Sequence, residues 1–237
     1  LDIDAIYKLK ASLQPLLSST TLDNVTRAVP VECIINLTEQ LSNPTVMFDI
    51  KVPNADSEIQ NAVANLLNKP LEAAITRWYY NDAKRILRSM PHLTIIGITG
   101  SFGKTSTKHF LHRVLSERYN VLMTPGNFNT TLGVVRTVRE HLKPHHEVFI
   151  VEMGAKQRGD IKEICDLVCP SMGIVTSVGE MHLETFGTVE SVALTKFELI
   201  DALPEGGFGI VNIDSEAAYN HIKKGGKARY IILNNNE

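Results

Sequence analysis

The stretch from residue 93 to residue 109 constrains the fold of this chain more than any other part of the sequence. Residues 93–98 are apolar and rich in β-branched side chains, which is typical of a strand buried in a parallel sheet. A turn with two glycines, Gly100-Ser-Phe-Gly103, follows and leads into Lys104-Thr105. Beyond it, apolar side chains recur at helical spacing at Phe110, Leu111, Val114 and Leu115. The stretch therefore predicts a strand, a glycine-rich turn and a helix in direct succession.

A glycine-rich turn between a strand and a helix is suited to binding phosphate. Glycines let backbone N–H groups close around phosphate oxygens, and the helix N-terminus adds partial positive charge. Lys104 can reach the β- and γ-phosphates of a nucleotide, and the Thr105 hydroxyl can bind Mg²⁺. The sequence thus predicts an ATP and Mg²⁺ site at Gly100, Ser101, Phe102, Gly103, Lys104, Thr105 and Ser106.

The spacing of this turn departs from the common phosphate-loop pattern G-x-x-x-x-G-K-[ST]. Counting back from Gly103, the first glycine of that pattern would stand at position 98, where this chain has Ile98. Gly97 is one residue too early. The alternative is an ordinary glycine-rich turn with an incidental lysine, but the strand before it and the helix after it favour a phosphate loop.

Composition and charge exclude several classes of protein. The chain has 237 residues, enough for one large domain or two smaller ones, and 43% of them are hydrophobic, as in globular proteins. A net charge of −2 gives no electrostatic reason to expect binding to nucleic acid or to an anionic membrane. No apolar run approaches the length of a transmembrane helix, and no signal peptide is visible at the N-terminus. We therefore expect a cytoplasmic protein.

The cysteines do not indicate a metal site. The chain has three cysteines, an odd number: Cys33, Cys165 and Cys169. The last two are four residues apart, on one face of a predicted helix. Without a partner set of histidines or cysteines they are interpreted as reduced core thiols rather than zinc ligands.

Residues 1–70 are predicted to be a separate N-terminal segment of mixed α and β structure. An amphipathic helix is expected near Leu9 to Leu17, strands over residues 31–37 and 45–52, and a helix over residues 57–68. Residues 41–56, Leu-Ser-Asn-Pro-Thr-Val-Met-Phe-Asp-Ile-Lys-Val-Pro-Asn-Ala-Asp, resemble the C-terminal region of bacterial TamB-type envelope proteins. The whole resemblance, of which this run is part, covers about 40 residues. It leaves open the possibility that the chain is a fusion.

Residues 71–237 are predicted to form the main domain. A helix over residues 70–90 has a wide apolar face with interspersed arginines and lysines; packing on a sheet is favoured over binding of a polyanion. Strands are then expected at 93–98, 120–124, 147–152, 172–177, 208–213 and 229–233. Helices are expected between them at 104–117, 131–142, 159–168, 188–202 and 215–222. This alternation predicts an α/β fold with a mostly parallel sheet and helices on both faces.

Polar side chains follow the predicted strands at the edge where such sheets bind ligands. Glu152 ends an apolar strand, where a carboxylate would face the phosphate loop and bind Mg²⁺, although a glutamate there can also cap a helix or lie at the surface. Taken alone, His182 is interpreted as structural and Lys196 as a solvated helix lysine. Asn127 and Asn129 would, by themselves, be turn residues.

Together, these stretches resemble the central domain of the Mur ligase family, the ATP-dependent amide-forming enzymes of peptidoglycan synthesis. The resemblance rests on Gly-Ile-Thr-Gly-Ser-Phe-Gly-Lys-Thr-Ser, Thr-Pro-Gly-Asn-Phe-Asn-Thr-Thr-Leu-Gly, Val-Glu-Met-Gly-Ala, Gly-Asp-Ile and His-Leu-Glu-Thr-Phe-Gly, which occur in that order over about residues 93–214. It is strongest with the subgroup that adds D-alanyl-D-alanine. Residues 1–70 do not resemble the family's UDP-binding first domain.

The resemblance implies roles for individual residues. Lys104 would bind the ATP phosphates and would be catalytic together with His182 and Lys196. Thr105 and Glu152 would bind one Mg²⁺, and His182 would help to bind a second. Lys196 corresponds to a family lysine that is carbamylated, which turns its amine into a carboxylate-like metal ligand.

The resemblance also implies the substrates. Asn127, Asn129 and Thr130 would meet UDP-N-acetylmuramoyl-tripeptide, whose carboxylate would be phosphorylated by ATP and then attacked by the amine of D-alanyl-D-alanine. We expect a monomer without the family's third domain and with an incomplete central one, which binds nucleotide weakly and does not ligate by itself. The alternatives are a folylpolyglutamate or cyanophycin synthetase-like ligase, and a non-catalytic nucleotide-binding module.

Overall fold

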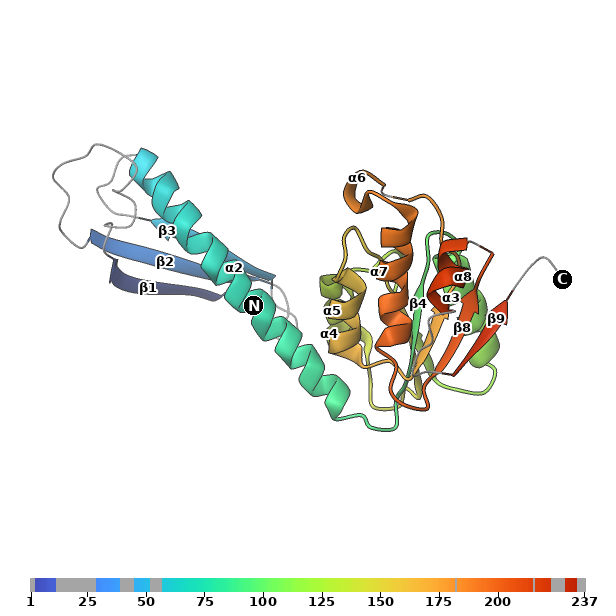
Figure 1. Ribbon diagram of the computed structural model, residues 1–237. Coiled ribbons are helices and arrows are strands. Elements are labelled where there is room, and N and C mark those ends of the chain that lie inside the picture. Colours follow the sequence, from blue (N-terminus) through green and yellow to red (C-terminus); the bar gives the residue numbers. More distant parts are fainter. Residues whose placement is uncertain are drawn as a thin grey trace. The chain divides into compact units, whose positions relative to one another are not determined.

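A computed structural model of the chain describes residues 3–11, 29–38, 45–51, 57–181, 183–214, 216–222 and 229–233. The chain divides into two compact units, Leu1–Trp78 and Tyr79–Glu237. The division falls inside one long helix, α2 (Ser57–Arg88), drawn in cyan to green in Figure 1. The two units are described separately.

The first unit contains an antiparallel sheet of three strands in the order β1-β2-β3. The strands are β1 (Ile3–Ala11), β2 (Val29–Thr38) and β3 (Thr45–Lys51). The two strands predicted here are present as β2 and β3. The helix expected near Leu9 is wrong at residues 3–11, which form β1 and pair with β2 from Ile3↔Leu37 to Ala11↔Val29. Residues 3–11 alternate largely between apolar and polar side chains, which suits a strand; residues 12–28 lie outside the described part.

Helix α2 replaces two shorter helices that the sequence predicts, over residues 57–68 and 70–90. The helix continues through Pro70, which lacks the N–H that an intrahelical hydrogen bond needs. Proline lowers the stability of a helix interior but does not always end it, and here the pattern on either side is helical.

The second unit is built on a six-stranded sheet in the order β5-β6-β4-β7-β8-β9, with every neighbouring pair parallel. Its strands are β4 (Thr94–Thr99), β5 (Val121–Met123), β6 (Val148–Glu152), β7 (Met172–Val175), β8 (Phe208–Asn212) and β9 (Arg229–Leu233). The predicted α/β fold with a parallel sheet is confirmed (Figure 1). All six strands lie at the predicted positions, within a few residues at their ends.

Helices cover both faces of this sheet, because its strands are apolar on both sides. The helices are α3 (Lys104–Leu115), α4 (Thr131–His141), α5 (Asp160–Val168), α6 (Leu183–Phe186), α7 (Val189–Asp201) and α8 (Glu216–Ile222). On one face, Ile95 packs in a core with α4, α5 and the end of α2. On the other face, Ile96 and Ile98 pack against Leu111 and Leu115 of α3. The short helix α6 lies where the sequence predicts only a loop.

Helix α7 approaches the sheet closely because two strand positions have no side chain. A Cβ atom on Gly97 of β4 would lie 2.6 Å from Leu199 Cδ1, and one on Gly173 of β7 would lie 3.0 Å from Leu199 Cγ. Leu199 is fully buried. The glycines therefore set how near α7, which carries Lys196, lies to the strand that leads into the phosphate loop.

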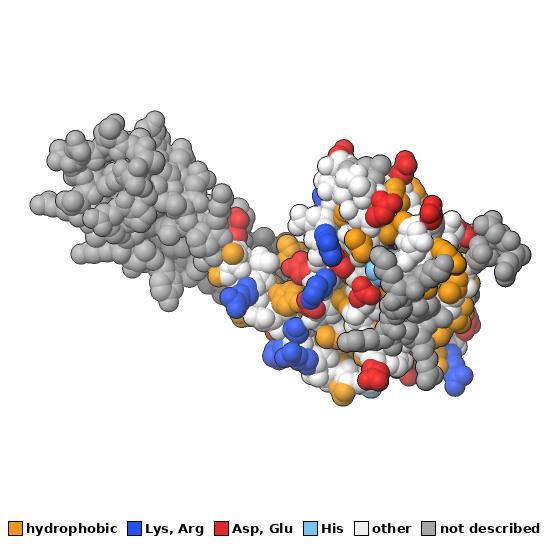
Figure 2. Space-filling view, in the orientation of Figure 1, with side chains coloured by type: hydrophobic (Ala, Val, Ile, Leu, Met, Phe, Trp, Pro, Cys, Tyr) orange, Lys and Arg blue, Asp and Glu red, His pale blue; other side chains and the backbone are white. Residues whose placement is uncertain are grey.

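The surface of the second unit mixes charges of both signs. On the face shown in Figure 2, basic and acidic side chains are interspersed among apolar and neutral ones. Within the part of the chain that the structure describes, no helix is both long and apolar enough to cross a membrane.

Candidate functional site

The turn between β4 and α3 has the backbone conformation that its glycines allow. Gly100 has φ of 149° and Gly103 has φ of 83°, both in the region that L side chains rarely adopt. A Cβ atom on Gly100 would lie only 2.0 Å from Thr176 Oγ1. The two glycines at this turn are therefore required both by backbone conformation and, at Gly100, by the close neighbour.

Residues that follow β7 hold this turn in place. The Thr176 hydroxyl lies 2.6 Å from Phe102 O and 3.1 Å from Thr99 O, and Ser177 Oγ accepts a hydrogen bond from Phe102 N at 2.9 Å. The buried Ser101 hydroxyl donates to Gly179 O and accepts from Gly179 N, both at 3.1 Å. Sequence reasoning missed Thr176 and Ser177. A polar pair directly after an apolar strand was the available signal.

The N-terminus of α3 is open to an anion. Its first residue is Lys104, its N-cap is Gly103, and no side chain caps it or places a negative charge in its first turn. By contrast, Thr130 caps α4 and Thr188 caps α7. The N–H groups of the first helical turn point outward from the helix end, so they and the helix dipole can stabilise phosphate there.

Lys104 lies across the turn and is partly buried. Its Nζ donates a hydrogen bond to Gly100 O at 2.8 Å. Burial lowers the pKa of Lys104 below its usual value, while the Glu152 carboxylate acts in the opposite direction. The ammonium therefore lies beside the turn, and Phe102 of the same turn is largely exposed.

Glu152 ends β6 and lies beside the phosphate loop, 1% exposed. The Thr105 hydroxyl lies 3.1 Å from Oε1 and 3.2 Å from Oε2 of this carboxylate. Asn129 Nδ2 donates to Oε1 at 3.3 Å. The alternative of an exposed surface glutamate is therefore wrong, and the structure brings together three residues that the sequence singles out from three separate segments.

Lys108, which sequence reasoning missed, completes the surroundings of Glu152. Its Nζ lies 2.9 Å from Glu152 Oε2 and donates to Gly126 O at 2.6 Å, and its side chain is fully buried. Lys108 stands on the same stripe of α3 as Leu111 and Leu115. A lysine in an apolar stripe was the signal that could have found it.

The three residues predicted to bind the substrate, in the loop before α4, have different surroundings. Asn129 faces inward: its carbonyl accepts from Gly154 N at 2.7 Å, and a Cβ on Gly154 would lie 2.8 Å from the Asn129 side chain. Asn127 is exposed. Thr130 Oγ1 accepts from Gly133 N at 3.3 Å and so caps α4. Only Asn127 therefore leaves its side chain free of the site's own contacts within the described residues.

Lys196 is buried in α7 with 2% exposure, so its interpretation as a solvated lysine is wrong. Burial, and then the charge of Lys104, lower the pKa of Lys196 to about 8. Among the described residues, none accepts a hydrogen bond from its Nζ. An amine in such a place is readily neutral and nucleophilic, which fits conversion to a carbamate.

The residues present fit a hard divalent cation held with phosphate oxygens. The Thr105 hydroxyl and the Glu152 carboxylate supply oxygen ligands, and Mg²⁺ typically takes one or two carboxylates together with substrate phosphates. His182 lies outside the described residues. Among the described residues, no cluster of three histidine, cysteine or acidic side chains is placed to hold a metal.

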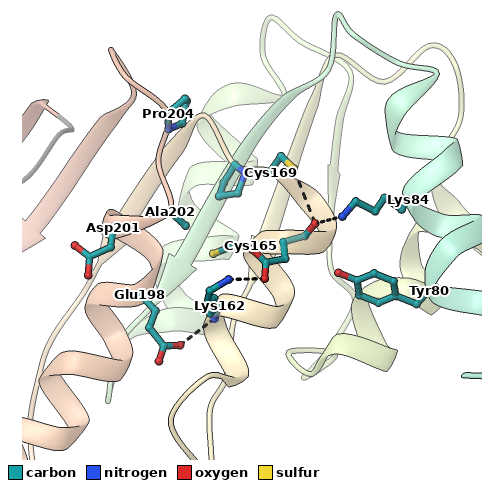
Figure 3. Close-up of a pocket in the computed structure, with 11 residues that line it drawn as sticks. Tyr80, Lys84, Lys162, Cys165, Cys169, Glu198, Asp201, Ala202 and Pro204 are labelled. Carbon is teal, nitrogen blue, oxygen red and sulfur yellow. Dashed lines mark hydrogen bonds and ion pairs between the residues drawn. The ribbon is translucent and has the colours of Figure 1, made fainter. Parts of the chain in front are cut away.

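A separate cavity of about 900 Å³ lies between α5, α7 and the second-unit part of α2 (Figure 3). None of the predicted site residues lines it. Glu198 on α7 accepts a hydrogen bond there from Lys162 N at 2.9 Å (Figure 3). It also accepts from Gly159 N at 2.8 Å, so it caps α5 from the neighbouring helix.

The two cysteines of this cavity differ from each other. Both are free, but only Cys165 is buried, and burial raises the pKa of its thiol to about 12. Cys169 is exposed, so its interpretation as a core thiol is wrong. Cys169 directly follows the last residue of α5 and has a left-handed backbone conformation, with φ of 49°. The helix has ended at this position, so Cys169 does not lie on the same helix face as Cys165.

Comparisons with known proteins show which family this chain is similar to. The Mur ligase middle domain matches residues 98–236. The UDP-N-acetylmuramoyl-tripeptide–D-alanyl-D-alanine ligase of Bacillus subtilis (strain 168) is 35% identical over 162 residues, which are 68% of this chain and 33% of the relative. The enzyme of the same name from Escherichia coli (strain K12) is 33% identical over 161 residues, 65% of this chain and 35% of the relative.

The chain is also similar to a solved structure. The MurF ligase of Thermotoga maritima in complex with ADP superposes with a TM-score of 0.63 at 29% identity, covering 68% of this chain and 37% of that one. The chain thus spans about a third of the length of these relatives. The resemblance drawn from the sequence motifs is confirmed: the chain belongs to the Mur ligase family.

Proposed function

We propose that the second unit is the nucleotide-binding part of an ATP-dependent ligase that joins D-alanyl-D-alanine to UDP-N-acetylmuramoyl-tripeptide. Relatives of that name from several bacteria support the substrate pair, and the ADP complex of a related structure supports the nucleotide. These relatives favour this reaction over that of a folylpolyglutamate or cyanophycin synthetase.

One observation carries the proposal. A buried carboxylate, Glu152, meets the Thr105 hydroxyl at 3.1 Å directly beside Lys104 and the uncapped N-terminus of α3. This set offers an anion site and a cation site side by side, as transfer of a phosphoryl group from Mg-ATP requires.

The chain's own residues divide the work. The backbone N–H groups around Gly103 and the Lys104 ammonium bind the phosphates, which positions the γ-phosphate and offsets its charge. Thr105 and Glu152 would hold one Mg²⁺, His182 would help to hold a second, and a carbamylated Lys196 would be a further metal ligand. When bound, Mg²⁺ would offset the charge of the phosphoryl group. Asn127, Asn129 and Thr130 line the side on which the nucleotide-linked substrate binds. The acyl phosphate so formed loses phosphate when the amine of D-alanyl-D-alanine attacks.

Carbamylation of Lys196 is part of this proposal. Its neutral amine attacks carbon dioxide, a C–N bond forms, and one proton leaves to solvent. The lowered pKa and the missing hydrogen-bond acceptor among the described residues support it. The carbamate would bring a second negative charge to a site where Glu152 is already paired.

Calorimetry with ATP and Mg²⁺ tests the nucleotide site. We expect the wild-type chain to bind and Lys104→Ala to lose at least about tenfold in affinity, because one charge-assisted contact to phosphate is removed. Lys143→Ala, which removes an exposed lysine from the loop before β6, is the matched control and keeps wild-type affinity. Binding that is absent in the wild type, or equal in the wild type and Lys104→Ala, contradicts the proposal.

The substrates are tested by phosphate release. We expect release from ATP to rise with UDP-N-acetylmuramoyl-tripeptide and not with a folate and glutamate. A rise only with the folate would favour the other ligase class. The monomeric state stays a prediction, which sedimentation can test.

A further inference from the structure

Lys108 is a buried lysine in the candidate site, and the proposed function assigns it no role. Lysine is rarely fully buried unless it is paired, and the side chain of Lys108 is 0% exposed. Its ammonium lies 2.9 Å from Glu152 Oε2 and 2.6 Å from the Gly126 carbonyl oxygen. It therefore stands inside the site, bound to the carboxylate proposed to hold the metal.

The contacts of Glu152 leave its two oxygens unequal. The Thr105 hydroxyl lies almost equally far from both, 3.1 Å from Oε1 and 3.2 Å from Oε2. The difference is that Oε2 faces the Lys108 ammonium, whereas Oε1 accepts from the neutral Asn129 Nδ2 at 3.3 Å. A cation that approaches Oε1 displaces only neutral groups. A cation that approaches Oε2 must separate a buried ion pair, which is much more costly. Lys108 thus leaves Glu152 one oxygen for a metal.

The ion pair of Lys108 and Glu152 also determines the net charge of the site before nucleotide binds. Lys108 and Glu152 cancel each other, so the carboxylate offers little net attraction to a divalent cation that arrives alone. Nucleotide phosphates at the N-terminus of α3 would supply the missing negative charge and further oxygen ligands. Without the ammonium, the buried carboxylate would be left uncompensated, and a cation would become its counter-ion.

We propose that Lys108 is a positioning residue that holds Glu152 for coordination through one oxygen and makes divalent-cation binding depend on bound nucleotide. The inference rests on the proposed function, because it takes the phosphates to bind beside Glu152. Lys108 acts through its contacts with the Glu152 carboxylate and the Gly126 carbonyl.

The experiment measures binding of Mn²⁺ to the full 237-residue chain with and without ADP, followed by electron paramagnetic resonance of the free ion. Because ADP itself binds Mn²⁺, each signal is compared with that of the same Mn²⁺ and ADP concentrations without protein. We expect the wild type to bind Mn²⁺ well only with ADP. Lys108→Met should bind Mn²⁺ without ADP at least about tenfold more tightly than the wild type, and the effect of ADP should shrink by a similar factor. Lys108→Arg keeps the charge and should keep the effect of ADP. Unchanged Mn²⁺ binding in Lys108→Met overturns the inference.

Lys108→Gln carries the same test if Lys108→Met does not fold. Its amide can still donate to Glu152 and to Gly126 O, so the charge is lost while a hydrogen bond remains. Tighter binding of Mn²⁺ without ADP is again expected, and its absence overturns the inference.

Two further variants show whether the cation responds to Glu152. Lys162→Met makes the same change in an exposed ion pair with Asp166 on α5, and should leave Mn²⁺ binding as in the wild type. The double variant Lys108→Met/Glu152→Gln should lose the Mn²⁺ binding gained by Lys108→Met. Gain of binding that persists in the double variant contradicts the role of Lys108.

The wild type separates this inference from the function on which it rests. If the wild type binds Mn²⁺ no better with ADP than without it, the proposed function is contradicted and the inference falls with it. If ADP promotes Mn²⁺ binding to the wild type and equally to Lys108→Met, only the inference falls.

Discussion

Gly100 is a residue at which backbone conformation and packing make the same demand. Its φ of 149° disfavours a side chain, and a Cβ there would collide with the hydroxyl that holds Phe102. Gly206 also has positive φ, of 80°, but nothing lies within 4 Å of a Cβ placed on it. Comparing substitutions at these two positions therefore distinguishes the effect of backbone strain from that of a steric clash.

We expect Gly100→Ala to lower the free energy of unfolding by at least about 2 kcal/mol and to abolish nucleotide binding, because Thr176 must move out of its contact with the turn. Gly206→Ala should cost about 1 kcal/mol, from strain alone, and leave nucleotide binding intact. Urea unfolding and calorimetry measure the two effects. Equal losses in both variants would show that the contact with Thr176 is unimportant.

At the scale of elements, helix α7 is positioned by two glycines that face Leu199. Gly97 lies on β4 and Gly173 on β7, so the helix packs across two neighbouring strands. The same helix carries Lys196, whose pKa responds to the Lys104 charge. Packing at Leu199 therefore sets the position of α7, and with it the position of Lys196.

Gly97→Ala should lower the free energy of unfolding by about 1–3 kcal/mol, because the new methyl group overpacks a fully buried side chain. Leu199→Ala should cost about 2–5 kcal/mol by leaving a cavity. In the double variant, the methyl group partly fills that cavity, so the combined loss should be smaller than the sum. Urea unfolding of all four chains tests this, and strictly additive losses would contradict direct packing.

At the scale of the whole molecule, an ion pair connects the second-unit part of α2 with α4. Asp82 on α2 accepts from Arg139 Nε of α4 at 3.1 Å and from Arg85 at 2.8 Å, and the Arg139 guanidinium stacks 4.1 Å from the centre of the Tyr79 ring. The hydrogen bond with Arg85 first, and then that with Arg139, hold the pKa of Asp82 below its usual value of 3.8, although burial opposes them. All these residues lie within the second unit.

Because the pKa of Asp82 is lower in the folded chain, its contribution to stability is present above pH 3.8 and is lost as pH falls through the folded-state value. Asp82→Asn should therefore lower the free energy of unfolding near pH 7 by at most about 1 kcal/mol, since the pair is partly exposed. The difference from the wild type should shrink below about pH 3.8. Urea titrations across this range measure it, and a difference that stays constant with pH would contradict the assignment.

The sequence alone determined the sheet and the phosphate loop. The strands of the second unit and its helices other than the short α6 are encoded in short windows of apolar periodicity, and Gly100 and Gly103 stand within four residues of Lys104. Where a tertiary contact outweighed the local signal, the prediction was wrong: residues 3–11 pair with β2 instead of forming a helix. The two separate helices predicted before and after residue 69 are also wrong, because the pattern on either side of Pro70 is helical and α2 runs on through it.

Only the tertiary structure decided the electrostatics of the site. Lys108 and Glu152 are far apart in the chain, and no periodic pattern relates them; parallel packing of β4 beside β6, with α3 over them, brings them within 2.9 Å. Burial likewise changed Lys196 from an expected solvated lysine into a buried amine. Local periodicity specifies elements because it depends on neighbours in sequence, whereas burial and ion pairing depend on neighbours in space.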